Sequence, residues 1–429
     1  MTMRGDRRRA KGGTAAFGAA VFLVAACSAP EGAFQRCESG TVADKPLGEC
    51  IRAGGSGGQG GAAGASGGGQ AGVDAACEPT RLATDAKNCG VCGRDCRGAP
   101  CQGGACQPEL LADRLTAPYA LALDGANVFW ASPAKGIASG AGASIFSLVR
   151  SAPVGTTPSP LFDGAIARTR SLARAPNGEL FWADLDVGAV LRRAQGVAQA
   201  TALATGRADV NQLVVAGDYV YWTQGALAAS RAEGAVARAP LAGGAAQSLA
   251  NMQLRPDALA VDGETACWVN RGPDGQVMRV KAGEPPELIE RVGDPIAVAA
   301  GPGRVVWAER ASGRVALLAE GAASATTLVR DASELVEGIA LEGELMYRVT
   351  FRPAERMLLL KRSALDGTSD VLLARVAPAD AGYAGNPLGA FVLAFDETYL
   401  YLADPGSASV DEAGVPLSQQ NGRLYRTPR

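Results

Sequence analysis

The most restrictive absence in this sequence is that of histidine, because the 429 residues contain none. Histidine is the usual general base and proton shuttle near neutral pH, and it is the commonest metal ligand. Its absence excludes Ser/His/Asp and Cys/His catalysis, His-ligated zinc and haem bound through histidine. An enzyme made from this chain would have to use carboxylates, Lys, Tyr or Arg, so we expect a protein that is not an enzyme and has no cofactor.

The sequence also lacks an excess of either charge and a long apolar run. Its 41 basic and 43 acidic residues give a formal charge of -2, which leaves no long-range field to attract nucleic acid or an anionic membrane surface. No stretch approaches the ~18 consecutive apolar residues that a membrane helix needs. The hydrophobic content of 47% is nevertheless ample for a large core.

Residues 1–26 have the pattern of a secretory signal peptide, with basic residues ahead of a short apolar run. The run ends in Val24-Ala25-Ala26-Cys27, which resembles the lipobox of bacterial lipoproteins. That resemblance implies cleavage before Cys27 and a lipid on it. The protein would then lie in the cell envelope, at the outer membrane, facing the periplasm or the exterior, with the lipid as its only membrane contact. The alternative is ordinary cleavage that leaves Cys27 as one more cysteine.

Two segments separate the signal from the first folded region. Residues 27–52 form a tether in which Cys37 and Cys50 predict a local disulfide loop. Residues 53–76 consist mainly of Gly, Ser, Ala and Gln, so they have almost nothing to bury and form a flexible linker.

Residues 77–107 form a cysteine-rich module that contains Cys77, Cys89, Cys92, Cys96, Cys101 and Cys106. Behind a secretory signal, such close spacing predicts three disulfides that staple a module too small for its own core. Six cysteines allow fifteen pairings, and the spacing does not choose among them. The two cysteines at positions 89 and 92 leave a zinc site or a thioredoxin-like redox site as alternatives.

The stretch Asn88-Cys89-Gly90-x-Cys92-Gly93-x-x-Cys96 resembles a module of secreted bacterial, chiefly myxobacterial, proteins. Plant stigma-specific proteins share a similar module. The resemblance covers about 30 residues and implies no known chemistry.

From residue 108 onward the sequence repeats. All five Trp residues occur in one context, as in NVFWAS at Trp130 and YVYWTQ at Trp222, and the other three are Trp182, Trp268 and Trp307. Two further copies place Tyr347 and Leu402 in this Trp slot, and successive slots lie 39 to 55 residues apart. Each copy reads as four short strands with Gly-rich turns, which is typical of a β-propeller blade.

Counting the strands predicts seven blades. There are seven first strands, such as LALDG at 121 and LAVDG at 259, but only six fourth strands follow them. The missing one precedes the first blade, as ELLAD at 109–113, and we expect it to pair with the C-terminal strand RLYRTP. Such closure removes the sheet edges that an open ring would expose. The predicted fold is therefore an all-β propeller over residues 108–429, preceded by the small disulfide-rich module.

The repeat resembles the YWTD and NHL-like propellers of secreted proteins, with FWAD at 181–184 nearest to the first. Most copies lack the acid of that motif, so the resemblance implies the fold rather than a ligand. Together with the cysteine module and the lipobox, the whole chain resembles a type of myxobacterial secreted lipoprotein for which no activity is generally established.

The repeat also accounts for the tenth cysteine. Cys267 occupies the slot before the Trp, which holds Phe129, Phe181, Tyr221, Val306, Met346 and Tyr401 in the other copies. We therefore expect a buried and inert thiol.

The strand order predicts where a ligand would bind. Long insertions at 131–143, 223–234 and 403–421 all join a second strand to a third, so they crowd one face of the ring, at which the first strands begin. Candidate contacts two residues before the first strands are Tyr119, Arg170, Asn211, Asp257, Ile296, Glu337 and Phe391. Candidates two residues after the Trp slot are Ser132, Asp184, Gln224, Asn270, Glu309, Val349 and Asp404. The alternative for each of them is a solvated rim of turn-capping acids and amides.

Three functions remain open. The first is a non-enzymatic envelope protein whose propeller binds a protein, peptide or glycan on the loop-rich face. The second is a metal-dependent, lactonase-like hydrolase, in which Asn211, Asp257 and Glu337 would surround a divalent cation in the channel. The third is a structural or assembly role, in which lipid, linker and module display the propeller.

Overall fold

The computed structural model describes residues 41–43, 50–52, 77–115, 118, 120–132, 144–153, 155–161, 169, 171–184, 187–197, 199–207, 209–226, 229–378, 392–406, 408–410, 416–418 and 421–429. The regular structure in these ranges is β, apart from one short 3-10 helix, η1 (Pro79–Arg81). Within them no helix has the length and apolar character to cross a membrane.

Seven four-stranded antiparallel sheets, here called blades 1 to 7, form the body of the protein. Blade 1 consists of β6 (Ala120–Leu123), β7 (Asn127–Ser132), β8 (Ser144–Val149) and β9 (Ser159–Pro160). Blade 2 consists of β10 (Leu172–Arg174), β11 (Leu180–Asp184), β12 (Ala189–Arg193) and β13 (Thr201–Thr205). Blade 3 consists of β14 (Val210–Ala216), β15 (Tyr219–Gln224), β16 (Gly234–Pro240) and β17 (Gln247–Gln253). Blade 4 consists of β18 (Pro256–Asp262), β19 (Thr265–Asn270), β20 (Gly275–Lys281) and β21 (Glu287–Val292). Blade 5 consists of β22 (Pro295–Gly301), β23 (Arg304–Glu309), β24 (Arg314–Ala319) and β25 (Thr326–Arg330). Blade 6 consists of β26 (Leu335–Glu342), β27 (Leu345–Arg352), β28 (Met357–Ala364) and β29 (Val371–Val376).

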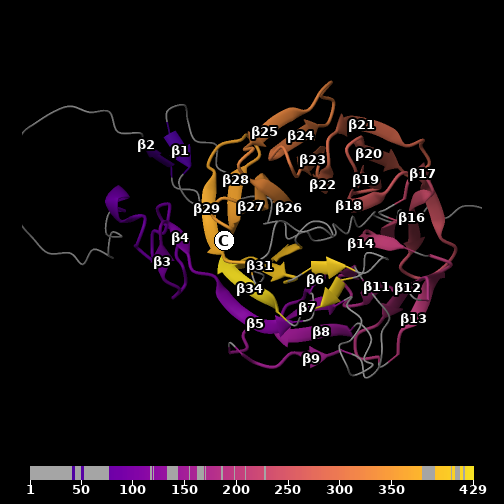
Figure 1. Ribbon diagram of the computed structural model, residues 1–429, viewed down its shortest axis with the longest axis horizontal. Coiled ribbons are helices and arrows are strands. Elements are labelled where there is room, and N and C mark those ends of the chain that lie inside the picture. Colours follow the sequence, from indigo (N-terminus) through magenta and orange to yellow (C-terminus); the bar gives the residue numbers. More distant parts are fainter. Residues whose placement is uncertain are drawn as a thin grey trace, which may run out of the picture.

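Blade 7 takes its fourth strand from the N-terminal end of the propeller sequence. Its order is β30 (Leu393–Phe395), β31 (Tyr399–Asp404), β34 (Gly422–Pro428) and β5 (Glu109–Leu115). The first strands contact one another in sequence, from β6 through β10, β14, β18, β22, β26 and β30 back to β6, and so close the ring (Figure 1). The predicted seven blades and the predicted closing strand are both confirmed.

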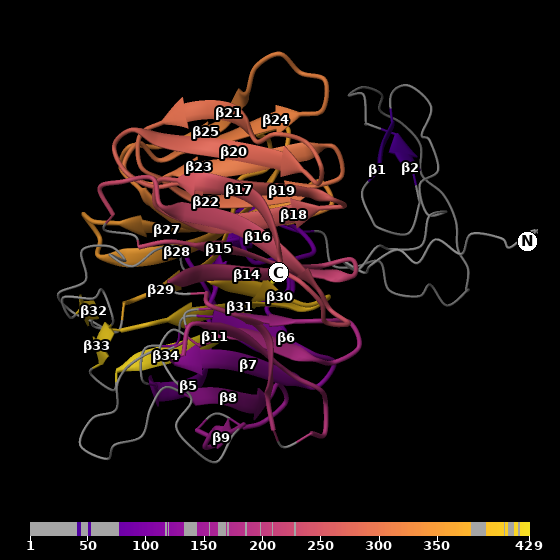
Figure 2. The ribbon, with the colours of Figure 1, turned by 90° about the vertical axis from the view of Figure 1, so that its right-hand side faces the viewer.

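Besides the hairpin of the cysteine-rich module, described below, two short hairpins of the described residues lie outside the blades. Strands β32 (Ala408–Val410) and β33 (Pro416–Ser418) pair within the insertion between β31 and β34, and Figure 2 shows them at one side of the ring. Strands β1 (Thr41–Ala43) and β2 (Cys50–Arg52) pair in the N-terminal tether. Cys27 and Cys37 fall outside the described residues, and so does the predicted disulfide loop between Cys37 and Cys50.

The hydrophobic core lies between neighbouring blades. All five Trp side chains are buried, and Trp307 of blade 5 packs with Cys267 and Val269 of blade 4. Blade 7 meets blade 1 in the same way, because Tyr401 and Trp130 belong to one cluster. Large rings that fill the space between sheets contribute much of the stability, since replacing a buried Trp by Ala typically costs about 3–5 kcal/mol.

Cys267 is the free thiol of the described residues, and it is buried as predicted. Burial raises the pKa of this thiol to about 12, so almost no reactive thiolate forms near neutral pH.

The predicted Trp slot of blade 6 is wrong by one residue. In the blades that have a Trp, it lies opposite the residue that begins the apolar repeat segment of the first strand, as Trp222 lies opposite Leu213. In blade 6 that partner position belongs to Arg348, which lies opposite Ile339, and Tyr347 takes the slot of Cys267, assigned above to Met346. A repeat position defined by aromatic rings is not recognisable here, because Arg348 occupies the slot and is held by polar contacts. Its guanidinium donates to Asp370 at 2.6 Å and to Ser363 at 3.1 Å.

The cysteine-rich module contains three disulfides, as predicted, and the structure pairs Cys77 with Cys92, Cys89 with Cys101 and Cys96 with Cys106. Its β-structure is one small hairpin, β3 (Cys101–Gln102) and β4 (Ala105–Cys106). Gly90 has a φ of +77°, and a Cβ there would lie 2.3 Å from the carbonyl oxygen of Gly104. The side chain of Asn88 accepts a hydrogen bond from the backbone N–H of Gly93 at 2.8 Å. The Asn-Cys-Gly stretch is therefore explained by the turn that it builds.

The module docks on the outer strand of blade 6. Figure 1 shows β3 and β4 beside β29, and β4 contacts that strand. Arg94 is only 5% exposed, and its guanidinium donates to the carbonyl oxygens of Leu372, at 2.8 Å, and Leu373. Burial lowers the pKa of Arg94 to about 10, which still leaves it charged near neutral pH. Val91 packs against the cluster that joins blades 6 and 7.

Replacing Arg94 by Ala should therefore weaken docking. Hydrogen bonds from a charged donor are worth more than neutral ones, so we expect the free energy of unfolding of the full chain to fall by about 2 kcal/mol. Urea unfolding measures the change, and limited proteolysis of the module reports undocking. Arg81→Ala is the control, because Arg81 lies in the same module with an exposed side chain. Equal stability of the two variants would contradict the docking role of Arg94.

Candidate functional site

The predicted site lies on what we call the rim face, the side of the ring at which first strands begin and second strands end. The element bounds confirm that the three long insertions join second strands to third strands, from β7 to β8, from β15 to β16 and from β31 to β34. Among the candidates, Tyr119, Arg170 and Phe391 fall outside the described residues. Ser132 ends β7, and its side chain is not described.

First strands bulge on the rim face in four consecutive blades. The pairing skips one residue of the first strand at Asn211 in blade 3, Ile296 in blade 5 and Glu337 in blade 6. In blade 4 the two residues Asp257 and Ala258 stand opposite one residue of the partner strand. A bulge re-aims a side chain and ends regular pairing. The residues predicted from repeat position are thus the bulged residues.

In blades 3 to 5 the turn before the bulge has a left-handed residue. Asp209, Arg255 and Asp294 directly precede the first strands of blades 3 to 5, with φ values of 53°, 54° and 50°. Each carbonyl oxygen accepts a hydrogen bond from the residue that follows the second strand, namely Gly225, Arg271 and Arg310, at 2.9 to 3.1 Å. A left-handed conformation is costly for residues other than glycine, and these bonds hold it. Both strand ends are therefore fixed at the rim.

In blade 3 the bulge ties one blade to the next. The side-chain amide of Asn211 donates to the carbonyl oxygens of Gly225, at 2.8 Å, and Pro256, at 2.7 Å. Thr223 donates to the carbonyl oxygen of Asp257 at 2.7 Å. Since Pro256 and Asp257 belong to blade 4, Asn211 has a structural role.

The bulged carboxylates of blades 4 and 6 hold arginines. Arg271 donates to Asp257 at 3.2 Å within blade 4. Arg310 of blade 5 donates to Glu337 of blade 6 at 3.0 Å, and Glu337 is 0% exposed. Two arginines from equivalent positions of adjacent blades are therefore anchored at the rim by acids behind them. Ile296 lies between these bulges in the ring, and it is also buried.

The candidates after the Trp slot mostly serve the indole rings and the turns. Gln224 accepts a hydrogen bond from the indole N–H of Trp222 at 2.9 Å, and Asn270 accepts one from Trp268 at 3.2 Å. Asp184 and Asp404 accept backbone N–H groups of the turns that follow, from Val187 and Gly406 respectively. Glu309 pairs with Arg314. The corrected register of blade 6 makes Thr350 the residue at this position, in place of Val349.

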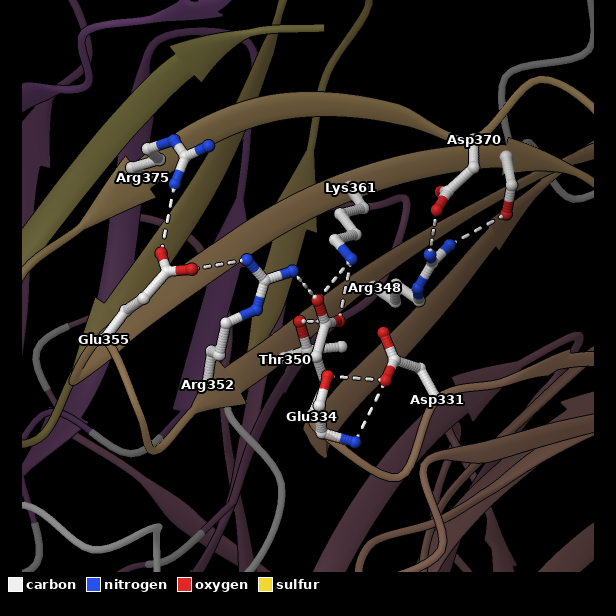
Figure 3. Close-up of polar contacts among 11 residues, drawn as sticks. Asp331, Glu334, Arg348, Thr350, Arg352, Glu355, Lys361, Asp370 and Arg375 are labelled. Carbon is white, nitrogen blue, oxygen red and sulfur yellow. Dashed lines mark hydrogen bonds and ion pairs between the residues drawn. The ribbon is translucent and has the colours of Figure 1, made fainter. Parts of the chain in front are cut away.

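A buried carboxylate anchors the turn that leads to Glu337 (Figure 3). Glu334 directly precedes β26 and is 2% exposed. Its oxygens accept from Lys361 at 2.6 and 2.7 Å, from Arg352 at 2.6 Å and from Thr350 at 2.7 Å. Burial alone would raise the pKa of Glu334, but the hydrogen bonds from Lys361 and Thr350 and the charge of Lys361 hold it below its usual 4.5.

Sequence reasoning missed Arg271, Arg310 and Glu334. The two arginines follow Asn270 and Glu309, so each stands three residues after a Trp, and a comparison of that position across the repeats would have found them. Glu334 has no counterpart in the other copies, and no repeat signal marks it.

The geometry gives no separate support to a cation in the channel. Asn211, Asp257 and Glu337 each have a protein partner, as described above. Within the described ranges, the group of three close cysteine or acidic residues is Cys89, Cys96 and Cys106, whose sulfurs are in disulfides. The hydrolase hypothesis stays a prediction.

No protein-family model matches the sequence, and no curated protein does. Several solved structures are similar in fold. A catalytically inactive variant of virginiamycin B lyase from Staphylococcus aureus, solved with quinupristin, is 11% identical, with a TM-score of 0.52 over 75% of this chain and 98% of that chain. A streptogramin B lyase is 10% identical, with a TM-score of 0.52 over 75% and 97% of the two chains. YCF48 bound to a D1 peptide is 12% identical, with a TM-score of 0.49 over 75% and 96%. At identities this low, the two lyase structures show a common fold and nothing of function.

Replacing Glu334 by Gln should reduce stability in a pH-dependent way. The variant leaves Lys361 and Arg352 without their buried carboxylate, and breaking such a pair typically costs about 3 kcal/mol. A carboxyl whose folded-state pKa is lowered stabilises fully above its ordinary value of 4.5, and this contribution is lost as the pH falls through the lower folded-state pKa. The difference between wild type and variant should therefore be largest near pH 7 and shrink below pH 4.5.

Urea unfolding at a series of pH values measures this difference. Glu355→Gln is the control, because Glu355 pairs with the same Arg352 from a much more exposed position. We expect Glu355→Gln to change stability little. A Glu334 variant whose deficit does not depend on pH would contradict the role of the ionised carboxylate.

Proposed function

We propose that this protein is a non-enzymatic, lipid-anchored binding protein of the bacterial cell envelope, whose rim face holds a protein or peptide. The observation that carries the proposal is the run of bulges at Asn211, Asp257, Ile296 and Glu337 in four consecutive blades. Irregular strand ends and loops on a rigid scaffold are where binding residues concentrate.

Arg271 and Arg310 would make the specific contacts. Within the described residues, Arg271 uses one nitrogen for Asp257, and Arg310 uses two nitrogens for Glu337. Each guanidinium therefore keeps further N–H donors for a ligand, while the acid behind it restricts its movement. Preorganised donors bind without a large loss of side-chain entropy. Acidic side chains or carbonyl groups of a polypeptide are suitable acceptors.

The absence of histidine supports binding rather than catalysis. The described carboxylates of the rim are engaged with arginines or with turn N–H groups, which supports a structural role for them. The lipid anchor rests on the residues before Cys27 and would hold the propeller at a membrane through the linker of residues 53–76.

Capture experiments with the full chain test the proposed face. A variant with Arg271→Gln and Arg310→Gln should bind its envelope partner at least about tenfold more weakly, because each arginine loses charged hydrogen bonds. Shortening the insertion at residues 407–420 should also weaken capture. Binding of the identified partner to immobilised protein measures both effects.

The matched control is Arg279→Gln with Arg304→Gln. These residues lie in the same two blades and form ion pairs with Glu287 and Glu344, away from the rim. The control should retain binding. Capture that is unchanged in both rim variants would show that the proposed face is wrong, and capture of glycans alone would contradict a polypeptide ligand.

The anchor is tested by Cys27→Ser. The wild-type chain should incorporate labelled palmitate and sediment with membranes, whereas the variant should do neither, because no thiol remains to carry the lipid. A Cys37→Ser variant is the control and should stay with the membranes. Membrane association of the Cys27 variant would contradict lipidation at that residue.

A further inference from the structure

A cavity of about 400 Å³ lies between the cysteine-rich module and blade 7. One wall is the module loop Cys96–Pro100, and the other is formed by Tyr399, Arg426, Pro428 and Glu109. Tyr399 begins β31, whereas Asp404 ends that strand at the rim face. The cavity therefore lies toward the opposite end of the blade from the rim face, and no role assigned above uses it. Its volume falls in the usual range for small-molecule sites, about 300–1,000 Å³.

The module wall is rigid. The disulfides Cys96–Cys106 and Cys89–Cys101 hold both ends of the loop. Within it, the N–H of Ala99 donates to the carbonyl oxygen of Cys96 at 3.0 Å, and the N–H of Gln107 donates to that of Pro100 at 2.9 Å. Docking through Arg94 fixes this wall against the propeller. The cavity is thus formed before any ligand binds, which lowers the entropic cost of binding.

Much of the lining is apolar, and four of its residues carry rings. Pro100, Pro108 and Pro428 offer flat faces without donors, and Tyr399 adds an aromatic ring. The guanidinium of Arg426 lies 4.8 Å from the centre of that ring. Such surfaces favour a planar aromatic group, which packs against rings and stacks on a guanidinium.

The charged groups in and beside the lining carry one positive charge in excess, since Asp95 lies near both Lys87 and Arg97 and can balance only one of them. Arg426 is neutralised by Glu109 through two hydrogen bonds of 2.7 and 2.9 Å. Arg97 has an exposed side chain, and the nearby Asp95 pairs with Lys87 at 2.7 Å. The net charge at the cavity mouth is therefore positive, which favours an anion.

We propose that this cavity binds an organic anion in which a carboxylate is attached to a planar aromatic ring. The ring packs between Tyr399 and the prolines, and the carboxylate pairs with Arg97. This chemistry has two sources, a free aromatic acid and the C-terminal aromatic residue of a peptide.

The test uses the full chain and two probes. 2-Naphthoate represents the free acid, and Gly-Gly-Phe with a free carboxylate represents the peptide end. Fluorescence anisotropy of naphthoate and calorimetry for the peptide measure affinity. Arg97→Glu should weaken binding at least about tenfold by replacing attraction with repulsion. Arg81→Glu is the matched control, because Arg81 is an exposed arginine of the same module outside the cavity, and it should bind as wild type does.

Uncharged analogues complete the design. 2-Naphthylmethanol and the amidated peptide should bind more weakly than the corresponding acids. Binding of naphthoate alone identifies the free acid as the source, and binding of the peptide alone identifies the peptide end. No saturable binding of either probe at millimolar concentration, or equal binding by Arg97→Glu and wild type, overturns the proposal. These outcomes are independent of the rim variants, since the cavity shares no residue with them.

Discussion

The pairing of β5 with β34 is the interaction on which the rest of the propeller depends. The two strands, residues 109–115 and 422–428, come from opposite ends of the propeller sequence, and only their pairing gives blade 7 four strands. The same pairing brings Leu111 and Leu424 into one cluster with Trp130 of blade 1. Ion pairs also join neighbouring blades around this seam. Arg174 of blade 2 pairs with Asp124 of blade 1, and Arg150 of blade 1 pairs with Asp396 of blade 7. Arg429 of blade 7 pairs with Glu342 of blade 6. Closure at this seam completes the ring of contacts between first strands, so the placement of the blades that carry the candidate site depends in part on a contact between distant parts of the chain.

Repetition explains why so much of this architecture could be predicted. A blade can bury its ring side chains only against another blade, so the same residue types return at the same slots, and their count reveals both the blade number and the missing strand. Prediction from the repeat fails where a slot holds a side chain that is buried through polar contacts instead of ring packing. Arg348 stands in a Trp slot and is buried through Asp370 and Ser363, and neither partner can be identified from one strand alone. A search for rings therefore chose Tyr347 and displaced blade 6 by one residue.

The candidate site was predictable in position but not in chemistry. Repeat position located the bulged residues, because a bulge occurs at the same place in successive blades. It did not reveal that Asn270 serves the indole of Trp268, or that Asp257 and Glu337 hold arginines. Those roles depend on the direction of a side chain after a bulge and on its neighbour in the next blade. A buried acid such as Glu334, whose cationic partners come from two other strands, is determined by tertiary packing alone.

Docking of the cysteine-rich module follows from how the outer strands are protected. An outer strand leaves a row of unpaired backbone groups, and charged residues on such an edge discourage pairing with another chain. Strand β21 carries Glu287, Glu290 and Arg291, and β17 (QSLANMQ) is rich in uncharged polar residues, whereas β29 reads VLLARV and is apolar apart from its one arginine. Arg94 donates to two carbonyl oxygens of β29, and Val91 covers part of its apolar cluster. The module therefore covers an edge that the propeller itself leaves apolar. It belongs to the propeller surface rather than serving only as a spacer, which is why the contact also creates a cavity.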